Sequence, residues 1–76
     1  MGQSSNIMYI KDEFVTLGQL VKHFHLVQTG GEVKFFLASH DIKVNGEAEN
    51  RRGKKLRPGD EILIDNQKFE VCMSSN

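Results

Sequence analysis

The segment from residue 29 to residue 60 constrains the fold most, because a helix pattern, a strand pattern and a basic loop follow one another in it. Val33, Phe36 and Leu37 have the spacing that places side chains on one face of an α-helix. Residues 42–44 then alternate between apolar and polar side chains, which is the period of a half-buried strand. The segment therefore predicts a fold that contains both helices and strands.

Local signals mark the ends of these elements. Asn45-Gly46 is a strong tight-turn signal, because both residues tolerate a positive φ. Thr29 and Glu32 have the spacing of a capping box, in which each side chain satisfies a backbone amide at the helix start. Residues 65–67 (DNQ) predict a second hairpin turn.

An earlier segment shows a second helix pattern. Thr16 and Gln19 again have the capping-box spacing, so we expect a helix that starts at Thr16 and ends near His25. Its apolar stripe consists of Leu17, Leu20, Val21 and Phe24. Helices this short are marginal in isolation, so we expect both to pack on each other and on a sheet.

Three apolar runs predict further strands of that sheet, at residues 7–10, 62–64 and 68–72. Phe14 and Val15 can either continue into the core or pack against the start of the first helix. We therefore expect an α+β fold, with two short packed helices against a small, mostly antiparallel sheet.

The length of 76 residues is that of a single domain spanning 1–76. We expect a core at about residues 7–72, with flexible tails at 1–6 and 73–76. No apolar run approaches the ~20 residues of a membrane span, and the N-terminus lacks the features of a secretory signal. The single cysteine, Cys72, cannot form an internal disulfide. These observations favour a cytoplasmic monomer that does not contact membranes.

Charge is distributed unevenly, although the formal net charge is zero. Residues 34–57 contain seven basic and three acidic side chains, a local net charge of +4. Within this range, residues 51–57 (RRGKKLR) contain five cations and no acidic residue. A local basic patch of this kind attracts phosphates, and the alternative is a solvated loop that only adds solubility.

Two short motifs flank the basic stretch, KVNG at 43–46 and PGDEI at 58–62. Their order and spacing, with NRRGKKL between them at 50–56, resemble the S4 RNA-binding domain. The segment TGGEVKFFL at 29–37 is similar to that of small stand-alone bacterial S4 proteins of the YaaA type. The resemblance covers about residues 14–64, and it implies an S4-like (alpha-L) fold that holds RNA with its second helix and basic loop.

This resemblance implies a non-catalytic module that binds ribosomal or transfer RNA in ribosome assembly or translation, with no cofactor and no small-molecule substrate. A surface this small is expected to bind weakly alone, so the ribosome or a protein partner is also expected. The predicted RNA contacts are Lys34, Lys43, Asn45, Arg51, Arg52, Lys54, Lys55 and Arg57. For Asn45, a role in turn geometry alone is equally compatible. Phe35 is a candidate for stacking on an unpaired base, although burial beneath residues 7–10 is the favoured alternative.

The chain departs from the family at Thr29 and Gly30, where many S4 domains have Ser-Arg. The arginine that is absent here often faces RNA. One hypothesis is that Gly30 and Gly31 allow a phosphate backbone to come close to the start of the helix.

Other classes of protein are less well supported. An adaptor that docks its basic loop on an acidic patch of a replication, repair or translation complex is the main alternative. A β-grasp sulfur carrier also fits PGDEI, but residues 74–76 are Ser-Ser-Asn and not the Gly-Gly that such chemistry needs. No metal site is predicted, because His23 and His25 diverge on a helix and His40 is remote from them. No catalytic residue is predicted either, and Cys72 fits a small buried hydrophobe.

Overall fold

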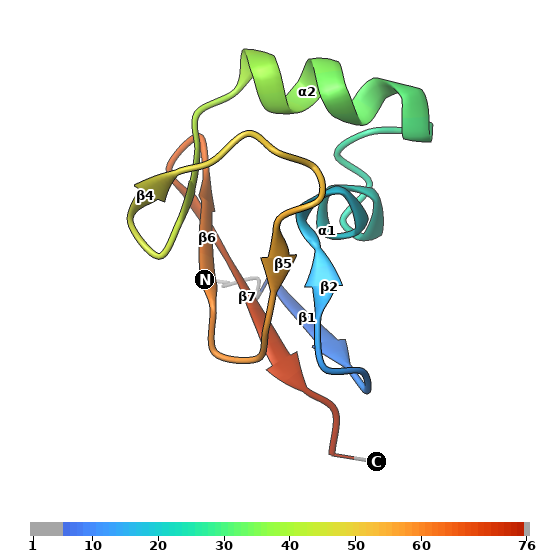
Figure 1. Cartoon of the computed structure of the whole chain (residues 1–76), viewed down its shortest axis with the longest axis vertical. Helices are drawn as coiled ribbons and strands as arrows, with labels where there is room; N and C mark the ends of the chain where they lie inside the picture. Colours follow the sequence, from blue (N-terminus) through green and yellow to red (C-terminus); the bar gives the residue numbers. More distant parts are fainter. Residues whose placement is uncertain (1–5, 76) are drawn as a thin grey trace, which may run out of the picture.

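The computed structural model describes residues 6–75 (Figure 1). The helices are α1 (Leu17–His23) and α2 (Val33–Ser39), and a 3-10 turn, η1 (Gly30–Glu32), leads into α2. The strands are β1 (Ile7–Ile10), β2 (Val15–Thr16), β3 (Ile42–Val44), β4 (Glu47–Ala48), β5 (Lys55–Leu56), β6 (Glu61–Ile64) and β7 (Gln67–Met73). The described helices are too short and too polar to cross a membrane.

The main sheet has five strands in the order β1-β7-β6-β3-β4. Neighbouring strands within this sheet are antiparallel, except that β1 runs parallel to β7, with Ile10 opposite Met73. Strands β2 and β5 form a separate antiparallel pair, in which Val15 lies opposite Leu56. The α+β fold with a mostly antiparallel sheet is therefore confirmed, and Val15 continues into the core as part of β2.

The predicted turns and the first helix cap are present in the structure. Asn45 and Gly46 have φ values of 51° and 87° between β3 and β4. Thr16 donates its backbone N–H to the side-chain oxygen of Gln19 at 2.9 Å, and Gln19 donates its N–H to the Thr16 hydroxyl at 3.2 Å. These contacts join residues close in sequence, which is why local patterns predict them.

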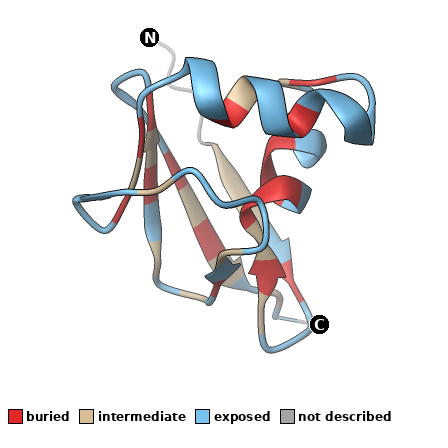
Figure 2. Ribbon diagram, turned by 45° about the horizontal axis from the view of Figure 1, so that its top comes forward, coloured by how far each residue is buried: buried red, intermediate tan, exposed pale blue. Residues whose placement is uncertain are grey.

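Both helices cover one face of the main sheet, and the hydrophobic core lies between the helices and the sheet (Figure 2). Both helices and every strand except β4 contribute buried side chains to this core. The largest fully buried side chains are Phe69, Leu17, Leu20, Leu56, Ile62, Val21 and Val71. Full burial of such a side chain stabilises a protein by about 1.5–3 kcal/mol. The two short helices depend on this shared core for their stability.

At both ends of the described chain, structural contacts extend beyond the predicted core, residues 7–72. Asn6 accepts a hydrogen bond from the N–H of Glu70 at 2.9 Å, and its side chain donates to the carbonyl of Lys68 at 3.2 Å. Met73 is the last residue of β7, so the sheet extends one residue beyond the predicted core at the C-terminal end. Residues 1–5 and 76 of the predicted tails lie outside the described residues.

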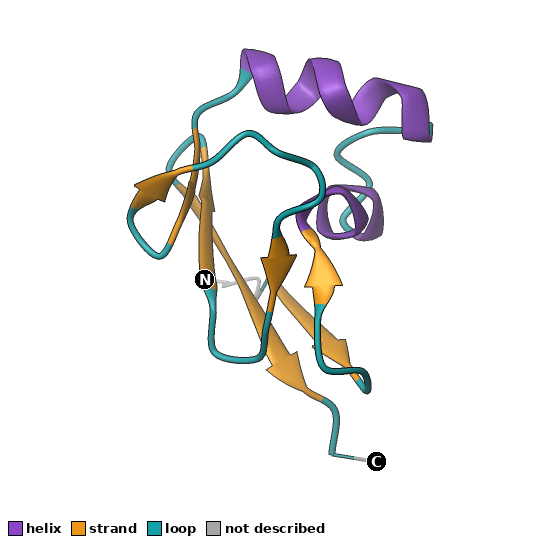
Figure 3. Cartoon of the chain, viewed as in Figure 1, coloured by secondary structure: helices purple, strands orange, loops and turns teal. Residues whose placement is uncertain are grey.

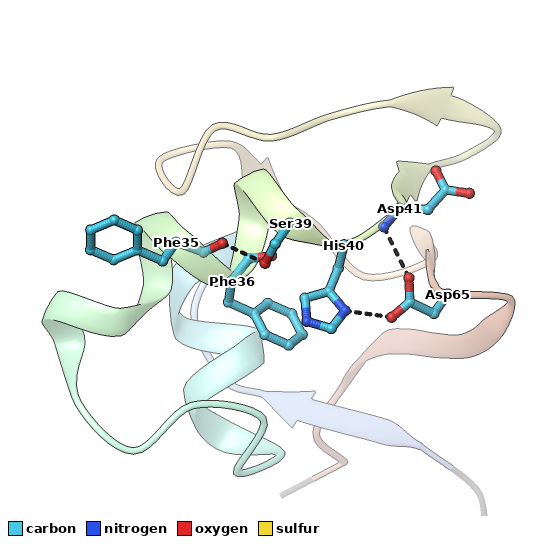
Figure 4. Close-up of polar contacts among 6 residues, drawn as sticks. All are labelled: Phe35, Phe36, Ser39, His40, Asp41 and Asp65. Carbon is cyan, nitrogen blue, oxygen red and sulfur yellow. Dashed lines mark hydrogen bonds and ion pairs between the residues drawn. The ribbon is translucent and has the colours of Figure 1, made fainter.

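A polar contact fixes the end of α2 to the turn between β6 and β7 (Figure 4). His40 contacts the carboxylate of Asp65 through Nδ1 and stacks on Phe36, with ring centroids 4.0 Å apart. Asp65 also accepts the N–H of Asp41 at 3.0 Å. His40 first, and then the Asp41 amide, hold the pKa of Asp65 below its ordinary value of 3.8. This contact therefore links the C-terminal end of α2 to the sheet, in addition to the burial of Val33 and Leu37 in the core.

Candidate nucleic-acid interface

The first part of the predicted basic loop lies in residues 49–54, which connect β4 to β5 without helix or strand structure, and Lys55 and Leu56 form β5 itself (Figure 3). The backbone of the loop is held by the start of α1, where Leu17 donates its N–H to the carbonyl of Lys54 and Gly18 donates to that of Arg52, both at 2.9 Å. First-turn amides have no partner within their own helix, so the loop carbonyls satisfy them. The position of the loop is thus fixed by its backbone, and its charged side chains are left available.

The two ends of the loop are anchored as well. Glu49 donates its backbone N–H to the carbonyl of Ile42 at 2.9 Å. At the other end, Leu56 is completely buried and pairs with Val15 across the β2–β5 ladder. A loop with three attachments holds its side chains in a defined arrangement, as a binding site requires.

The loop and α2 together enclose an open groove of about 830 Å³. Six of the predicted RNA contacts line it, namely Lys34, Arg51, Arg52, Lys54, Lys55 and Arg57. Lys34 comes from α2, whereas the others come from the β4–β5 loop, from β5 or, for Arg57, from the segment that follows β5, so the fold brings together basic residues that are distant in the sequence. A concave surface lined by charge of one sign concentrates counter-ions such as phosphates.

Arg51 is partly neutralised within the protein. Its Nε lies 2.9 Å from the carboxylate of Glu49, which also accepts the backbone N–H of Arg51 at 3.1 Å. These two hydrogen bonds lower the pKa of Glu49 to about 2, and Glu49 in turn raises the pKa of Arg51. The predicted run of unopposed cations therefore has an internal counter-charge at one end.

The other groove cations differ in their surroundings. The ammonium of Lys55 lies 4.9 Å from the centre of the Phe14 ring, a cation–π contact. Within residues 6–75, no salt bridge to an acidic side chain involves the four remaining cations, Lys34, Arg52, Lys54 and Arg57. These four are the strongest candidates for phosphate contacts.

Two predicted RNA contacts, Lys43 and Asn45, do not line the groove. The ammonium of Lys43 lies 3.5 Å from the carboxylate of Asp41. The Asn45 side chain donates to Asp60 at 3.1 Å and accepts the N–H of Glu61 at 2.9 Å, so it joins the β3–β4 turn to β6. The structure gives Asn45 a structural role, and RNA contact by either residue stays a prediction.

Lys22 is a basic residue that sequence reasoning missed. A second depression of about 340 Å³ shares Arg52 and Gly53 with the groove and is also lined by Lys22 and Gly30. The ammonium of Lys22 lies 4.0 Å from where a Cβ at Gly30 would be. Lys22 thus supplies a cation beside the position where many family members have arginine. The sequence showed only that Lys22 lies off the apolar stripe of α1 and is therefore exposed. It did not show which residues lie near Lys22 in the fold.

The start of α2 already has an anion from the chain itself. The Glu32 carboxylate accepts the N–H of Gln28 at 2.8 Å and that of Thr29 at 3.4 Å, which confirms its reach back to the helix start. Gly30 and Gly31 are exposed, but a phosphate that approached them would meet the negative charge of Glu32. The Lys22 ammonium beside Gly30 would have the opposite effect, so a phosphate site at these glycines stays a prediction.

Phe35 is exposed, with 75% of its surface accessible. The favoured expectation that residues 7–10 cover it is wrong, because β1 lies at an edge of the sheet and its side chain Ile10 packs in the core. The prediction for Cys72 is also corrected, because this residue is half-buried. Within residues 6–75, no cluster of three histidine, cysteine or acidic side chains is arranged to hold a metal ion.

A basic groove between the second helix and a docked loop, on this α+β scaffold, defines a small nucleic-acid-binding domain. Residues 8–72 match the S4 domain family, and the chain belongs to this family. It is similar to a curated protein of Bacillus subtilis (strain 168), the "probable ribosome maturation protein RlbA". The two are 44% identical over 61 residues, which cover 80% of this chain and 86% of the relative.

Proposed function

We propose that this protein binds structured ribosomal RNA through the groove between α2 and the β4–β5 loop, and that it acts in ribosome maturation without catalysing a reaction. The observation that carries the proposal is the convergence of six cations on one groove. Membership of the S4 domain family and the printed name of the Bacillus subtilis relative support the same role.

The arrangement of charge suits a phosphate backbone. Lys34 comes from α2, Arg52 and Lys54 from the β4–β5 loop, and Arg57 from the segment after β5, so a strand of RNA that follows the groove meets cations from the helix and from the chain opposite it. Arginine offers a planar fork to phosphate oxygens, whereas lysine acts as a point charge. Folded RNA is recognised mostly by its shape and by contacts to phosphates and 2′-hydroxyls, which a small rigid groove can supply.

The test is a series of binding measurements over increasing salt, with ribosomal subunits, transfer RNA and an unrelated RNA duplex as ligands. We expect the double variant Arg52→Ala/Lys54→Ala to bind ribosomal RNA more weakly and with a shallower dependence on salt. Each lost phosphate contact reduces the slope of log K against log salt by about 0.7–0.9, so the double variant should lose about 1.4–1.8.

The matched control is Lys11→Ala/Lys68→Ala, which removes the same charge outside the groove. We expect this control to keep the wild-type slope. If both double variants lost RNA affinity and salt slope equally, the effect would come from net charge alone, and a defined binding site would be contradicted. If folded wild-type protein bound none of the three RNAs at low salt, the proposed function would be refuted. If it preferred transfer RNA, ribosomal RNA would be wrong as the proposed target and transfer RNA would replace it.

A further inference from the structure

Phe35 has an exposed ring and directly follows a residue of the basic groove in α2. Lys34, the preceding residue, lines the groove from α2. Ala38 is exposed and lies one helical turn from both Lys34 and Phe35, so these three residues share the outer side of the helix. Because alanine is small, it leaves the face of the neighbouring ring open.

Two neighbours of Phe35 on α2 make contacts that do not involve its ring. The hydroxyl of Ser39 folds back on the helix and donates to the carbonyl of Phe35 at 2.7 Å. Phe36 points to the other side, where it stacks on His40 (Figure 4). Phe35 points away from this pair and from the body of the protein (Figure 4). The helix therefore presents an aromatic face next to a cation, on a segment whose end is fixed by the contact of His40 with Asp65.

We propose that Phe35 stacks on an unpaired base of the RNA while Lys34 binds a phosphate next to that base. This inference rests on the proposed function, and it narrows the ligand to structured RNA with a bulged or looped-out nucleotide. Aromatic side chains bind bases in this way because every base has a stacking face. A base within a continuous duplex cannot present that face, so the unpaired nucleotide is the requirement.

Charge complementarity favours RNA over an apolar protein pocket as the occupant. A pocket that accepted the ring would have to place its rim against Lys34 and the other groove cations, which line an open surface. Desolvating an ammonium group without a partner is costly. An RNA backbone supplies the compensating negative charge at the same place.

The experiment compares two short RNA hairpins that differ only in one bulged adenosine, with Phe35→Ala and wild type. We expect wild type to bind the bulged hairpin more tightly than the fully paired one. Phe35→Ala should lose affinity for the bulged hairpin by about 5- to 150-fold, the range for loss of one base–aromatic stack, and should keep its affinity for the paired hairpin. Phe35 is exposed, so the variant should fold as wild type does.

A second variant, Phe35→Trp, gives a direct signal because the chain has no tryptophan. Its fluorescence should be quenched by the bulged hairpin and little changed by the paired one. The matched control is Tyr9→Trp, at an exposed position of β1 outside the groove, whose fluorescence should not respond to either hairpin.

Equal affinity of wild type for the two hairpins would overturn the stacking proposal and leave the proposed function standing. An equal loss of affinity of Phe35→Ala for both hairpins would also overturn the stacking proposal alone. So would a loss of association with ribosomal particles but not with the bulged hairpin, which would indicate that Phe35 contacts a protein. Loss of all RNA binding by wild type would instead refute the proposed function. The Arg52→Ala/Lys54→Ala variant, which should weaken binding to both hairpins, separates these cases.

Discussion

Gly18 donates its backbone N–H to the carbonyl of Arg52 at 2.9 Å, and this bond places the basic loop directly on the first turn of α1. The approach is so close that a Cβ at position 18 would lie 3.3 Å from both the Cβ and the carbonyl oxygen of Arg52. Any side chain at this position would require the loop to move by a few tenths of an ångström, so the placement of the binding groove is sensitive to a residue that carries no charge.

Enlarging residue 18 should therefore displace the loop. We expect Gly18→Val to lower the free energy of unfolding by about 1–3 kcal/mol, the cost of overpacking a close contact, and to weaken RNA binding. Urea denaturation and RNA titration measure the two effects. Gly53→Val is the control for stability, because a Cβ at Gly53 meets nothing within 4 Å. A stable Gly18→Val protein with wild-type RNA affinity would contradict the role of the docked loop.

Lys22 should behave as a phosphate contact although it lies on α1. We expect Lys22→Ala to weaken RNA binding and to reduce the slope of log K against log salt by about 0.7–0.9. Lys11→Ala, an exposed cation outside both depressions, is the matched control and should leave the slope unchanged. An unchanged slope for Lys22→Ala would restrict the interface to the groove of α2 and the loop.

Asn45 should matter for stability and not for RNA affinity. Asn45→Ala places an ordinary residue at a φ of 51° and removes two hydrogen bonds, so we expect it to cost about 2–4 kcal/mol. Asn45→Gly keeps the backbone unstrained and loses only the same two hydrogen bonds, so it should cost less than Asn45→Ala, about 1–3 kcal/mol. Chemical denaturation gives both values. If the folded Asn45→Gly protein bound RNA more weakly than wild type, the side chain would have to contact RNA as the sequence suggested.

Glu49 should make the protein more stable above pH 4.5 than in acid. Its carboxylate has a pKa of about 2 in the folded state against an ordinary 4.5, because Arg51 donates two kinds of hydrogen bond to it. The resulting stabilisation is complete above pH 4.5 and is lost as the pH falls toward 2.

Glu49→Gln removes this dependence. We therefore expect the difference in urea midpoint between wild type and Glu49→Gln to be largest near neutral pH and to shrink as the pH falls below 4.5. Taking the difference cancels the titration of other carboxylates, including Asp65. A difference that does not change with pH would show that the ion pair with Arg51 contributes nothing to stability.

Local patterns predicted most of the elements. The capping pair Thr16 and Gln19, the Asn45-Gly46 turn and the apolar face of α2 all form between residues a few positions apart, so their geometry depends little on the rest of the chain. The basic loop was also predicted as a candidate site, because clustered charge is visible in a sequence.

Contacts between distant residues were not predictable in the same way. The parallel pairing of β1 with β7 and the exposure of Phe35 both depend on which edge of the sheet the first strand joins. Glu49 was missed as a partner of Arg51 because its carboxylate lies just outside the run of cations.

The sequence by itself determined the helices, the turns and the presence of a basic segment, because backbone propensity, side-chain period and charge are properties of neighbouring residues. Only the tertiary structure decided that this segment is docked on Gly18, that Lys34 faces it across a groove and that Lys22 extends its charge. The physical reason is that all three depend on how the two helices share a single buried core, and burial is a property of the whole chain.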